Sequence, residues 1–428
     1  MRLTRRDFAR LLAISGTGTL VPTAASALER VPVPKRPLRP ADGSPSESYW
    51  EDVRQHFLMP PDRTHINAAN LCPAPRAVIE AHEQWSRMMD ADPSAPIKTK
   101  LADAREETRK VIAQFLGASP DEIVITRNTS ESNNFISSGV ALGPGDEVVL
   151  YSDNHPTNLN AWREKAKRYG FRVTVVANIH PHPGADGYVD AFRKALTPRT
   201  KLLGFTHVTS SVGDVLPARD LCAMARERGI LTLVDGAQSF GSLAVNLAEM
   251  QPDFYTGSAH KWPCGPKETG LLFVRRDIQD RLTPSVNGLY PGRVGLSRTL
   301  EGLGQRDEAG LAALAEAFRF QTTIGRQAVE ARVRELAQLL IGELAKVPGV
   351  EVWTPRDPSR SAGVVTFKPG SLDPRRLLTA MYEKDKIACT ARAGDDRPGI
   401  RLSAHIYNPV SEVERVVAAV KRHLANGV

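Results

Sequence analysis

The sequence predicts an α/β fold, with a mostly parallel seven-stranded sheet in a large domain and a smaller C-terminal α+β domain. Two observations carry this prediction. Short apolar runs alternate with helical patterns through the middle of the chain, as in doubly wound parallel sheets. One such run, residues 231–234, is apolar or β-branched throughout and lies between Gly229 and Gly236, as expected of a strand buried on both faces. The predicted strands are residues 122–126, 147–151, 172–177, 201–206, 230–234, 254–257 and 270–274.

The elements on either side of this alternation define the domain organisation. We expect short helices before it, a helix over residues 101–116 with Gly117 as its C-cap, and one long helical stretch over residues 308–347 after it. The C-terminal part then reads β, β, α, β, β, α, with strands 364–367, 387–390 and 400–403 and helices 374–384 and 411–424. The predicted units are a targeting segment (1–27), an extended segment (28–60), a large domain (61–300), and linking helices with a small domain (301–428).

Composition excludes several classes of protein. The chain has 428 residues, 41% hydrophobic and 24% charged, which is globular and long enough for one large domain and a smaller one. No window of 18 or more residues is apolar, so we expect neither a transmembrane helix nor a stable membrane anchor. The four cysteines are far apart and show neither metal spacing nor a disulfide framework, which predicts mostly buried small residues.

The N-terminus has the order of parts of an export signal. Arg5 and Arg6 form a twin arginine before a mildly apolar stretch, and residues 25–27 (Ala-Ser-Ala) fit a cleavage site. The alternative is a basic, frayed N-terminus. We expect residues 1–27 to direct the chain through the twin-arginine (Tat) translocon to the periplasm. Their removal takes away four arginines and one aspartate and so lowers the formal charge from +8 to +5. With no Lys/Arg run, this charge does not predict nucleic-acid binding.

Residues 256–261 (Thr-Gly-Ser-Ala-His-Lys) are the stretch around which the chain is organised. They read as a strand that runs into a turn of small residues and ends at Lys261. An amine attacks an aldehyde only when it is neutral, so a lysine of this kind must be desolvated or lie near other positive charge. We predict that Lys261 holds pyridoxal 5'-phosphate (PLP) as a Schiff base. By itself, the hexapeptide fits an ordinary exposed lysine at least as well.

Asp235 changes that balance. It ends the buried strand at residues 230–234, at the carboxyl edge where open α/β sheets place their ligands. A carboxylate there can pair with a protonated pyridine nitrogen and keep the ring an electron sink, and Gln238 could hydrogen-bond the ring hydroxyl. The alternative for Asp235 is a cap of the following turn.

Further polar residues follow the predicted strands. Thr129 and Ser130 open a helix, where amide and hydroxyl groups form an anion site, and Ser258 and His260 could add donors to a phosphate. His155 follows the next strand and could stack on a flat ring. The alternatives are N-capping by Thr129 or Ser130 and a hydrogen-bonded loop histidine. Asp214 follows another strand and could also face the site; its role is left open.

Four segments in this order and spacing resemble class V aminotransferase-like PLP enzymes of fold type I. They are residues 129–131, 155–158, 234–238 and 258–261, and the resemblance extends over about residues 60–425. It implies that Thr129, Ser130, Ser258 and His260 hold the phosphate, that His155 stacks on the ring, that Asp235 and Gln238 bind the ring nitrogen and oxygen, and that Lys261 also moves protons.

The same resemblance supplies partners and substrate contacts. It implies a homodimer with shared active sites, although Gln305 stands where the family usually has a threonine that reaches the partner's cofactor. Residues 399–408 match the family's carboxylate-binding segment, so Arg401 is the candidate for the substrate α-carboxylate, since a guanidinium fork binds a carboxylate bidentately. Arg392 and Asn67 are further substrate-binding candidates.

The reaction is less constrained by sequence than the cofactor. Desulfurases of a related group carry a nucleophilic cysteine just after the Arg-x-Gly that residues 392–394 resemble; here Asp395 follows, so desulfuration is disfavoured. Export, and a resemblance to the periplasmic PLP enzymes of pyoverdine siderophore maturation, predict oxidative decarboxylation of a siderophore-borne glutamate to succinamide. Transamination, an epimerisation like that of isopenicillin N, and a non-enzymatic PLP sensor are the alternatives.

Overall fold

A computed structural model describes residues 45–179, 182–392 and 396–428. The predicted export signal, residues 1–27, lies outside the described residues, as does the first part of the predicted extended segment, up to residue 44. Among the described residues, no helix combines the length and the apolar character needed to span a membrane.

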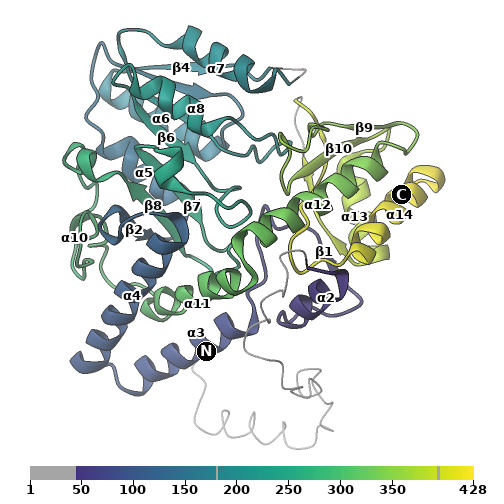
Figure 1. The fold of residues 1–428 in the computed structure, drawn as a ribbon, viewed down its shortest axis with the longest axis horizontal. Helices are drawn as coiled ribbons and strands as arrows, with labels where there is room; N and C mark the ends of the chain where they lie inside the picture. Colours follow the sequence, from purple (N-terminus) through teal and green to yellow (C-terminus); the bar gives the residue numbers. More distant parts are fainter. Residues whose placement is uncertain (1–44, 180–181, 393–395) are drawn as a thin grey trace, which may run out of the picture. The chain divides into compact units, whose positions relative to one another are not determined.

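The large sheet has seven strands in the order β2-β8-β7-β6-β5-β3-β4, and all neighbours are parallel except those of β8 (Figure 1). This confirms the predicted sheet, with boundaries shifted by at most one residue. The strands are β2 (Ile123–Thr126), β3 (Glu147–Tyr151), β4 (Arg172–Val176), β5 (Thr200–Thr206), β6 (Leu231–Asp235), β7 (Phe254–Ser258) and β8 (Gly270–Val274).

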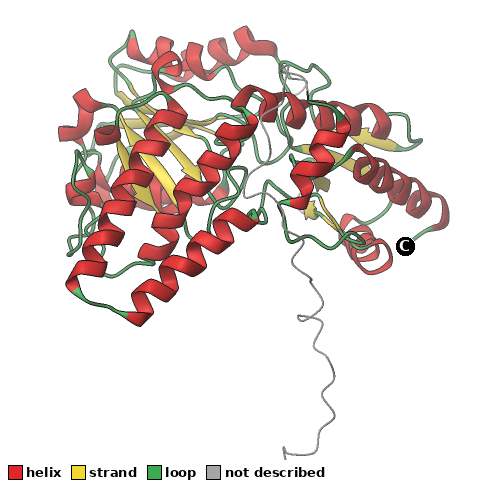
Figure 2. Cartoon of the chain, turned by 60° about the horizontal axis from the view of Figure 1, so that its bottom comes forward, coloured by secondary structure: helices red, strands yellow, loops and turns green. Residues whose placement is uncertain are grey.

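Both faces of this sheet are buried. Along β3, Val149 and Tyr151 join one hydrophobic cluster while Val148 and Leu150 join another, because alternate side chains of a strand point to opposite faces. Helices pack on both sides of the strands (Figure 2). The helices of this part are α4 (Ala95–Leu116), α5 (Thr129–Gly139), α6 (Pro156–Tyr169), α7 (Gly184–Ala195), α8 (Ala218–Arg226), α9 (Leu247–Met250) and α10 (Ser297–Leu300). Because both faces of each strand are buried, the strands appear in the sequence as continuous apolar runs.

The predicted helical stretch over residues 308–347 consists of two helices. α11 (Glu308–Ile324) ends and α12 (Arg326–Leu344) begins at Gly325, whose φ is +100°. A residue other than glycine is strained in that conformation. The break lets α11 pack along α4 in the large part, while α12 packs against the C-terminal sheet and α14 (Val410–Asn426).

The C-terminal part is the predicted α+β unit. Its antiparallel sheet has the order β12-β13-β10-β9, and its own core includes side chains from α12, α13 and α14. The predicted strand 387–390 is divided: β11 pairs in parallel with β1 of the N-terminal segment, and β12 joins the sheet. The elements are β9 (Val350–Val352), β10 (Val365–Pro369), α13 (Pro374–Asp385), β11 (Ile387–Ala388), β12 (Thr390–Arg392), β13 (Gly399–Leu402) and, upstream, α2 (Glu47–Gln55), β1 (Thr64–His65) and α3 (Arg76–Ala91).

Candidate active site

The candidate site lies where the large sheet meets the C-terminal part. Parallel strands end at one edge of a sheet, and there β6 ends at Asp235 and β7 ends three residues before Lys261. At this edge α5 begins at Thr129 and α6 begins just after His155. Arg401 reaches the same region from β13 and donates from Nη1 to the carbonyl of Ser210, 2.9 Å away, in the loop after β5. The edge predicted from sequence therefore gathers residues from both parts.

Asp235 is held by three donors. It is 1% exposed, Asn133 Nδ2 donates to its Oδ2 at 3.0 Å, and the Ala237 amide donates to its Oδ1 at 3.0 Å. Asn158 Nδ2 lies 3.4 Å from Oδ2. Residue 236 is a glycine because the Tyr255 ring packs against it: a Cβ at that position would lie 2.1 Å from the ring. Hydrogen bonds of this kind orient a carboxylate and stabilise its charged form.

Asn133 and Asn158 are site residues that the sequence patterns do not indicate directly. Asn133 lies four residues after Thr129 on α5, on the same helix face. Its Oδ1 accepts from Thr256 Oγ1 at 3.1 Å, so it links β6, β7 and α5. The position of Asn133 one helical turn after Thr129 is the sequence feature that predicts its place beside the site.

The start of α5 forms an anion-binding arrangement. The amide and hydroxyl of Thr129 both lie within 2.9 Å of Ser258 Oγ, which joins the helix start to the end of β7. The Asn128 side chain caps the helix by accepting from the Glu131 amide at 3.0 Å, so N-capping falls to Asn128 rather than to Thr129 or Ser130. Within the described residues the Ser130 amide has no partner, and it lies at the positive end of the helix dipole.

His260 adds a buried donor or acceptor beside this arrangement. Its Nδ1 is buried without a hydrogen-bond partner in the described part of the chain. Burial, and then the positive charges of Lys261 and Lys267, lower the pKa of His260 to about 4. The imidazole is therefore neutral at physiological pH and can donate one N–H to an anion without bringing a net charge.

Lys261 has the electrostatic environment that its predicted role requires. Burial lowers its pKa to about 8, the positive charge of Arg401 adds to this, and Asp235 opposes it. Its amine makes no hydrogen bond or ion pair with the described residues. It is thus a lysine whose neutral form is accessible near neutral pH and whose nitrogen is not engaged elsewhere.

This environment predicts a pH dependence for cofactor capture. A lowered pKa makes the neutral amine available at lower pH, so capture of PLP by cofactor-free protein should speed up about tenfold per pH unit below pH 8 and level off above it. An ordinary lysine would keep accelerating toward its usual pKa of about 10.4. Stopped-flow absorbance after mixing with PLP measures this, and a rate that still rises well above pH 8 would contradict the assignment.

His155 and Gln238 lie where ring contacts were predicted. His155 precedes α6 and its Nδ1 pairs with Thr157 Oγ1 at 2.8 Å, which fixes the ring; burial and the nearby Lys261 and Arg401 charges lower its pKa. Gln238 Nε2 donates to the Ala69 carbonyl at 3.0 Å, and its Oε1 accepts from Trp262 Nε1 at 2.8 Å. One N–H of the Gln238 amide remains for a ligand oxygen.

Of the substrate candidates, Arg392 and Arg401 lie on the neighbouring strands β12 and β13, and Asn67 lies in the N-terminal segment that runs beside them. Asn67 pairs with Ser403 in a β-bridge and accepts from Thr390 Oγ1 at 2.7 Å, which connects it to β12. Arg401 Nε is buried without a partner among the described residues, and burial lowers the pKa of this guanidinium to about 10. A buried guanidinium without a carboxylate partner is suited to binding an anion.

Asp214 does not face the site. It is 1% exposed and accepts from Tyr188 Oη at 2.5 Å, Arg360 Nη2 at 2.6 Å and His182 Nδ1 at 2.8 Å. Its main chain also forms a β-bridge with Ser361. These contacts tie the loop after β5 to the C-terminal part, so Asp214, whose role the sequence left open, has a structural role. All its partners are distant in sequence, except for the Thr209 turn.

Comparison with known proteins supports the same assignment over nearly the whole chain. The Aminotransferase class-V family matches residues 67–416. An isopenicillin N epimerase from Amycolatopsis lactamdurans is 33% identical over 390 residues, which cover 87% of this chain and 98% of the relative. A probable cysteine desulfurase from Xylella fastidiosa is 30% identical over 408 residues, covering 88% and 96%. The chain belongs to the class-V aminotransferase family.

A solved structure agrees on the fold. A C-DES variant with glycine covalently linked to its PLP cofactor has a TM-score of 0.80 with this chain at 22% identity, over 86% of this chain and 98% of that one. As a member of the class-V aminotransferase family, the protein is a PLP-dependent enzyme. The α/β fold, the enzyme class and the cofactor predicted from sequence are therefore confirmed.

The residues of the site fit PLP. Lys261 offers a free amine of lowered pKa, the Ser130 amide and the His260 ring offer unpaired polar atoms near a helix N-terminus, and Asp235 offers an oriented carboxylate. These correspond to the aldehyde, the phosphate and the pyridine nitrogen of the cofactor. When bound, PLP withdraws electrons from the substrate α-carbon and so weakens the bonds at that carbon.

The cysteines of this class-V enzyme do not supply a nucleophile of the desulfurase kind. All four are buried, and burial raises the pKa of Cys222 and of Cys389 to about 12. Burial also raises the pKa of Cys264 well above its usual value. A catalytic cysteine is partly exposed and reacts as the thiolate. The environment of the cysteines thus agrees with the sequence argument against desulfuration.

Proposed function

We propose that this enzyme inverts the configuration at the α-carbon of an amino-acid group, with Arg401 binding the α-carboxylate and Lys261 moving the α-proton. The single observation that carries the proposal is the Lys261 amine, which is unengaged, has a pKa of about 8, and lies within electrostatic reach of both Asp235 and Arg401. A base whose pKa lies near the working pH is the efficient one for proton transfer.

Two facts support inversion over the other reactions open to a PLP enzyme. The relative from Amycolatopsis lactamdurans is named isopenicillin N epimerase and aligns over 98% of its length. The buried cysteines argue against the desulfurase activity for which other relatives are named. Inversion needs removal of the α-proton on one face of the α-carbon, here by Lys261, and return of a proton from solvent to the opposite face, so no redox partner is required.

Proton return from solvent is the test. We expect the purified enzyme in D₂O to place deuterium at the α-carbon of a substrate amino acid and to convert one enantiomer into the mixture, as seen by mass spectrometry and chiral chromatography. The gain is one mass unit per molecule because one C–H becomes one C–D. Stoichiometric loss of the amino group or of CO₂ would contradict epimerisation and would identify the reaction as a transamination or a decarboxylation.

The N-terminal twin arginine favours a second candidate, the tailoring of a siderophore in the periplasm. In this case the substrate is the glutamate group of a pyoverdine precursor, and the product is its succinamide form or, by transamination, a keto acid. Both change the mass of the precursor, whereas inversion does not. Incubation of the mature enzyme with such a precursor therefore separates the candidates, and an unchanged mass would argue against this one.

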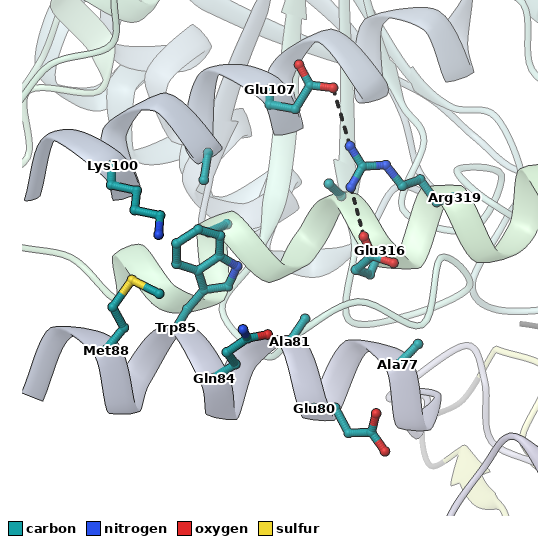
Figure 3. A pocket seen from close by; sticks show the side chains of 13 residues that line it. Ala77, Glu80, Ala81, Gln84, Trp85, Met88, Lys100, Glu107, Glu316 and Arg319 are labelled. Atoms are coloured by element: carbon teal, nitrogen blue, oxygen red, sulfur yellow. Dashed lines mark hydrogen bonds and ion pairs between the residues drawn. The ribbon is translucent and has the colours of Figure 1, made fainter. Parts of the chain in front are cut away.

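We also propose that two copies of the chain associate through the region of α3. Of the 16 residues of α3 only Val78 is buried, and Ile79 is 37% exposed. Trp85 and Met88 line a cavity of about 700 Å³ that α3 forms with α4 and α11 (Figure 3). A second copy would cover these apolar side chains. Sedimentation equilibrium should give twice the chain mass, and a monomer at micromolar concentration would contradict the proposal.

A further inference from the structure

Strands β12 and β13 place two arginines on one face of the C-terminal sheet. In the antiparallel register Thr390 lies opposite Arg401, and Arg392 follows Thr390 by two residues. Residues two apart in a strand share a face, so Arg392 and Arg401 are diagonal neighbours, with Cα atoms roughly 7–8 Å apart. Two like charges at this spacing repel unless counter-ions lie between them.

Neither guanidinium has a carboxylate partner among the described residues. The Nη1 atom of Arg392 and the Nε atom of Arg401 are both buried without a hydrogen bond. The one hydrogen bond of the Arg401 side chain goes to the Ser210 carbonyl, which carries no net charge. Removing a charged group from water without a partner is costly, so an arrangement of this kind is expected to bind an anion.

The two carboxylates whose charges act on Arg392, those of Asp153 and Asp396, are engaged by a third arginine. Arg397 Nη2 lies 3.1 Å from Asp153 Oδ2 and 2.7 Å from Asp396 Oδ2. Ser211 Oγ also donates to Asp153, at 2.5 Å. Arg397 is thus neutralised by two carboxylates. Among the described residues, Arg392 and Arg401 have no such counter-charge, so only these two of the three arginines lack one.

The guanidiniums of Arg392 and Arg401 have different charged neighbours. Arg401 interacts electrostatically with Lys261 and with His155, whereas the charges that act on Arg392 are those of Asp153, Arg397 and Asp396. Arg401 is therefore the guanidinium whose charge acts on Lys261, and Arg392, whose charge acts on Arg401, lies beside it on the same face of the sheet.

We infer that the substrate is an amino acid with a second carboxylate on its side chain, which Arg392 binds while Arg401 binds the α-carboxylate. The inference rests on the proposed function in one respect, the assignment of Arg401. It defines a substrate class of acidic amino acids with four to six carbons, since their two carboxylates span a distance that two diagonal arginine side chains can bracket.

A binding measurement tests this apart from catalysis. The PLP-loaded enzyme is titrated calorimetrically with glutarate, which has two carboxylates, and with butyrate, which has one. We expect glutarate to bind at least about 10-fold more tightly, because a charged hydrogen-bonded pair adds that much. Arg392→Gln should remove the preference and leave butyrate affinity unchanged, Arg401→Gln should weaken both ligands, and Arg392→Lys should keep part of the preference.

The controls separate a lost subsite from a damaged protein. Arg375→Gln removes the same charge from an exposed position on α13 and should alter neither affinity. The absorption of bound PLP should be the same in wild type, Arg392→Gln and Arg375→Gln. Equal affinities of the wild type for glutarate and butyrate, no binding of either, or a preference that persists in Arg392→Gln would overturn the inference.

The outcome also distinguishes this inference from the proposed function. If neutral amino acids exchange their α-hydrogen as fast as acidic ones, the assignment of Arg392 to a second carboxylate is wrong, whereas the proposed epimerisation is still supported. If glutarate binds through Arg392 but no amino acid exchanges deuterium, the anion site stands and the proposed reaction falls.

Discussion

Replacing Lys261 with alanine is expected to abolish covalent attachment of PLP and to lower turnover by at least about 10³-fold. One nitrogen performs both tasks: it links to the cofactor aldehyde, and it takes the α-proton of the substrate. The adjacent lysine cannot replace it, because Lys267 Nζ donates to the Cys72 carbonyl at 3.1 Å.

Lys267→Ala is the matched control, since it removes a lysine from the same loop. It should retain covalently bound PLP and most of the activity. Both variants are compared by visible absorption after gel filtration and by the deuterium assay. A Lys261→Ala enzyme that retains near wild-type turnover would show that another group moves the proton.

Asp235→Asn is expected to lower turnover by about 100-fold or more while PLP remains attached to Lys261. The neutral amide keeps the size of the side chain but cannot stabilise a proton on the pyridine nitrogen, so the ring withdraws electrons less well. The loss should appear in kcat rather than in the retention of cofactor. The measurement is kcat for α-deuterium exchange, with cofactor occupancy determined from absorbance.

Asp253→Asn controls for loss of a buried carboxylate. Asp253 is also buried and holds the Thr232 amide at 2.7 Å and Arg275 at 2.9 Å, next to the amino-terminal ends of β6 and β7, away from the site. Its substitution should lower the melting temperature and leave turnover per folded molecule unchanged. An equal loss of activity in Asp235→Asn and Asp253→Asn would contradict the assignment of Asp235 to the pyridine nitrogen.

Local patterns were enough to predict the large sheet and the residues at its edge. A strand buried on both faces must be apolar along its whole length, which makes β3, β6 and β7 visible in sequence. Polar residues directly after such strands meet at one edge of the sheet, so the positions of Thr129, Asp235 and Lys261 followed from topology alone. The roles of these residues toward PLP came from the family resemblance.

Contacts between distant segments could not be predicted in the same way. The partners of Gln238 are Ala69 and Trp262, and those of Asp214 are His182, Tyr188 and Arg360. None of these pairs follows a helical or strand period. The helix break at Gly325 was also missed, because a single glycine within a periodic pattern is compatible with a continuous helix and only tertiary packing decides between the two.

The pairing of Arg392 with Arg401 illustrates the step from sequence to structure. Both were substrate candidates by resemblance, but only the register of β12 with β13 places them on one face. Neither has a carboxylate partner in the described chain, whereas the neighbouring Arg397 has two. Arg392 and Arg401 therefore form one anion-binding pair.

The central claim is that Lys261 carries the cofactor, and chemical reduction tests it most directly. The purified enzyme is treated with borohydride, which fixes the covalent link, then digested, and the peptides are weighed. We predict that the pyridoxyl mass is found on the peptide that contains Lys261 and on no other. Labelling of Lys267 instead, or no labelled peptide from protein that holds PLP, would contradict the account.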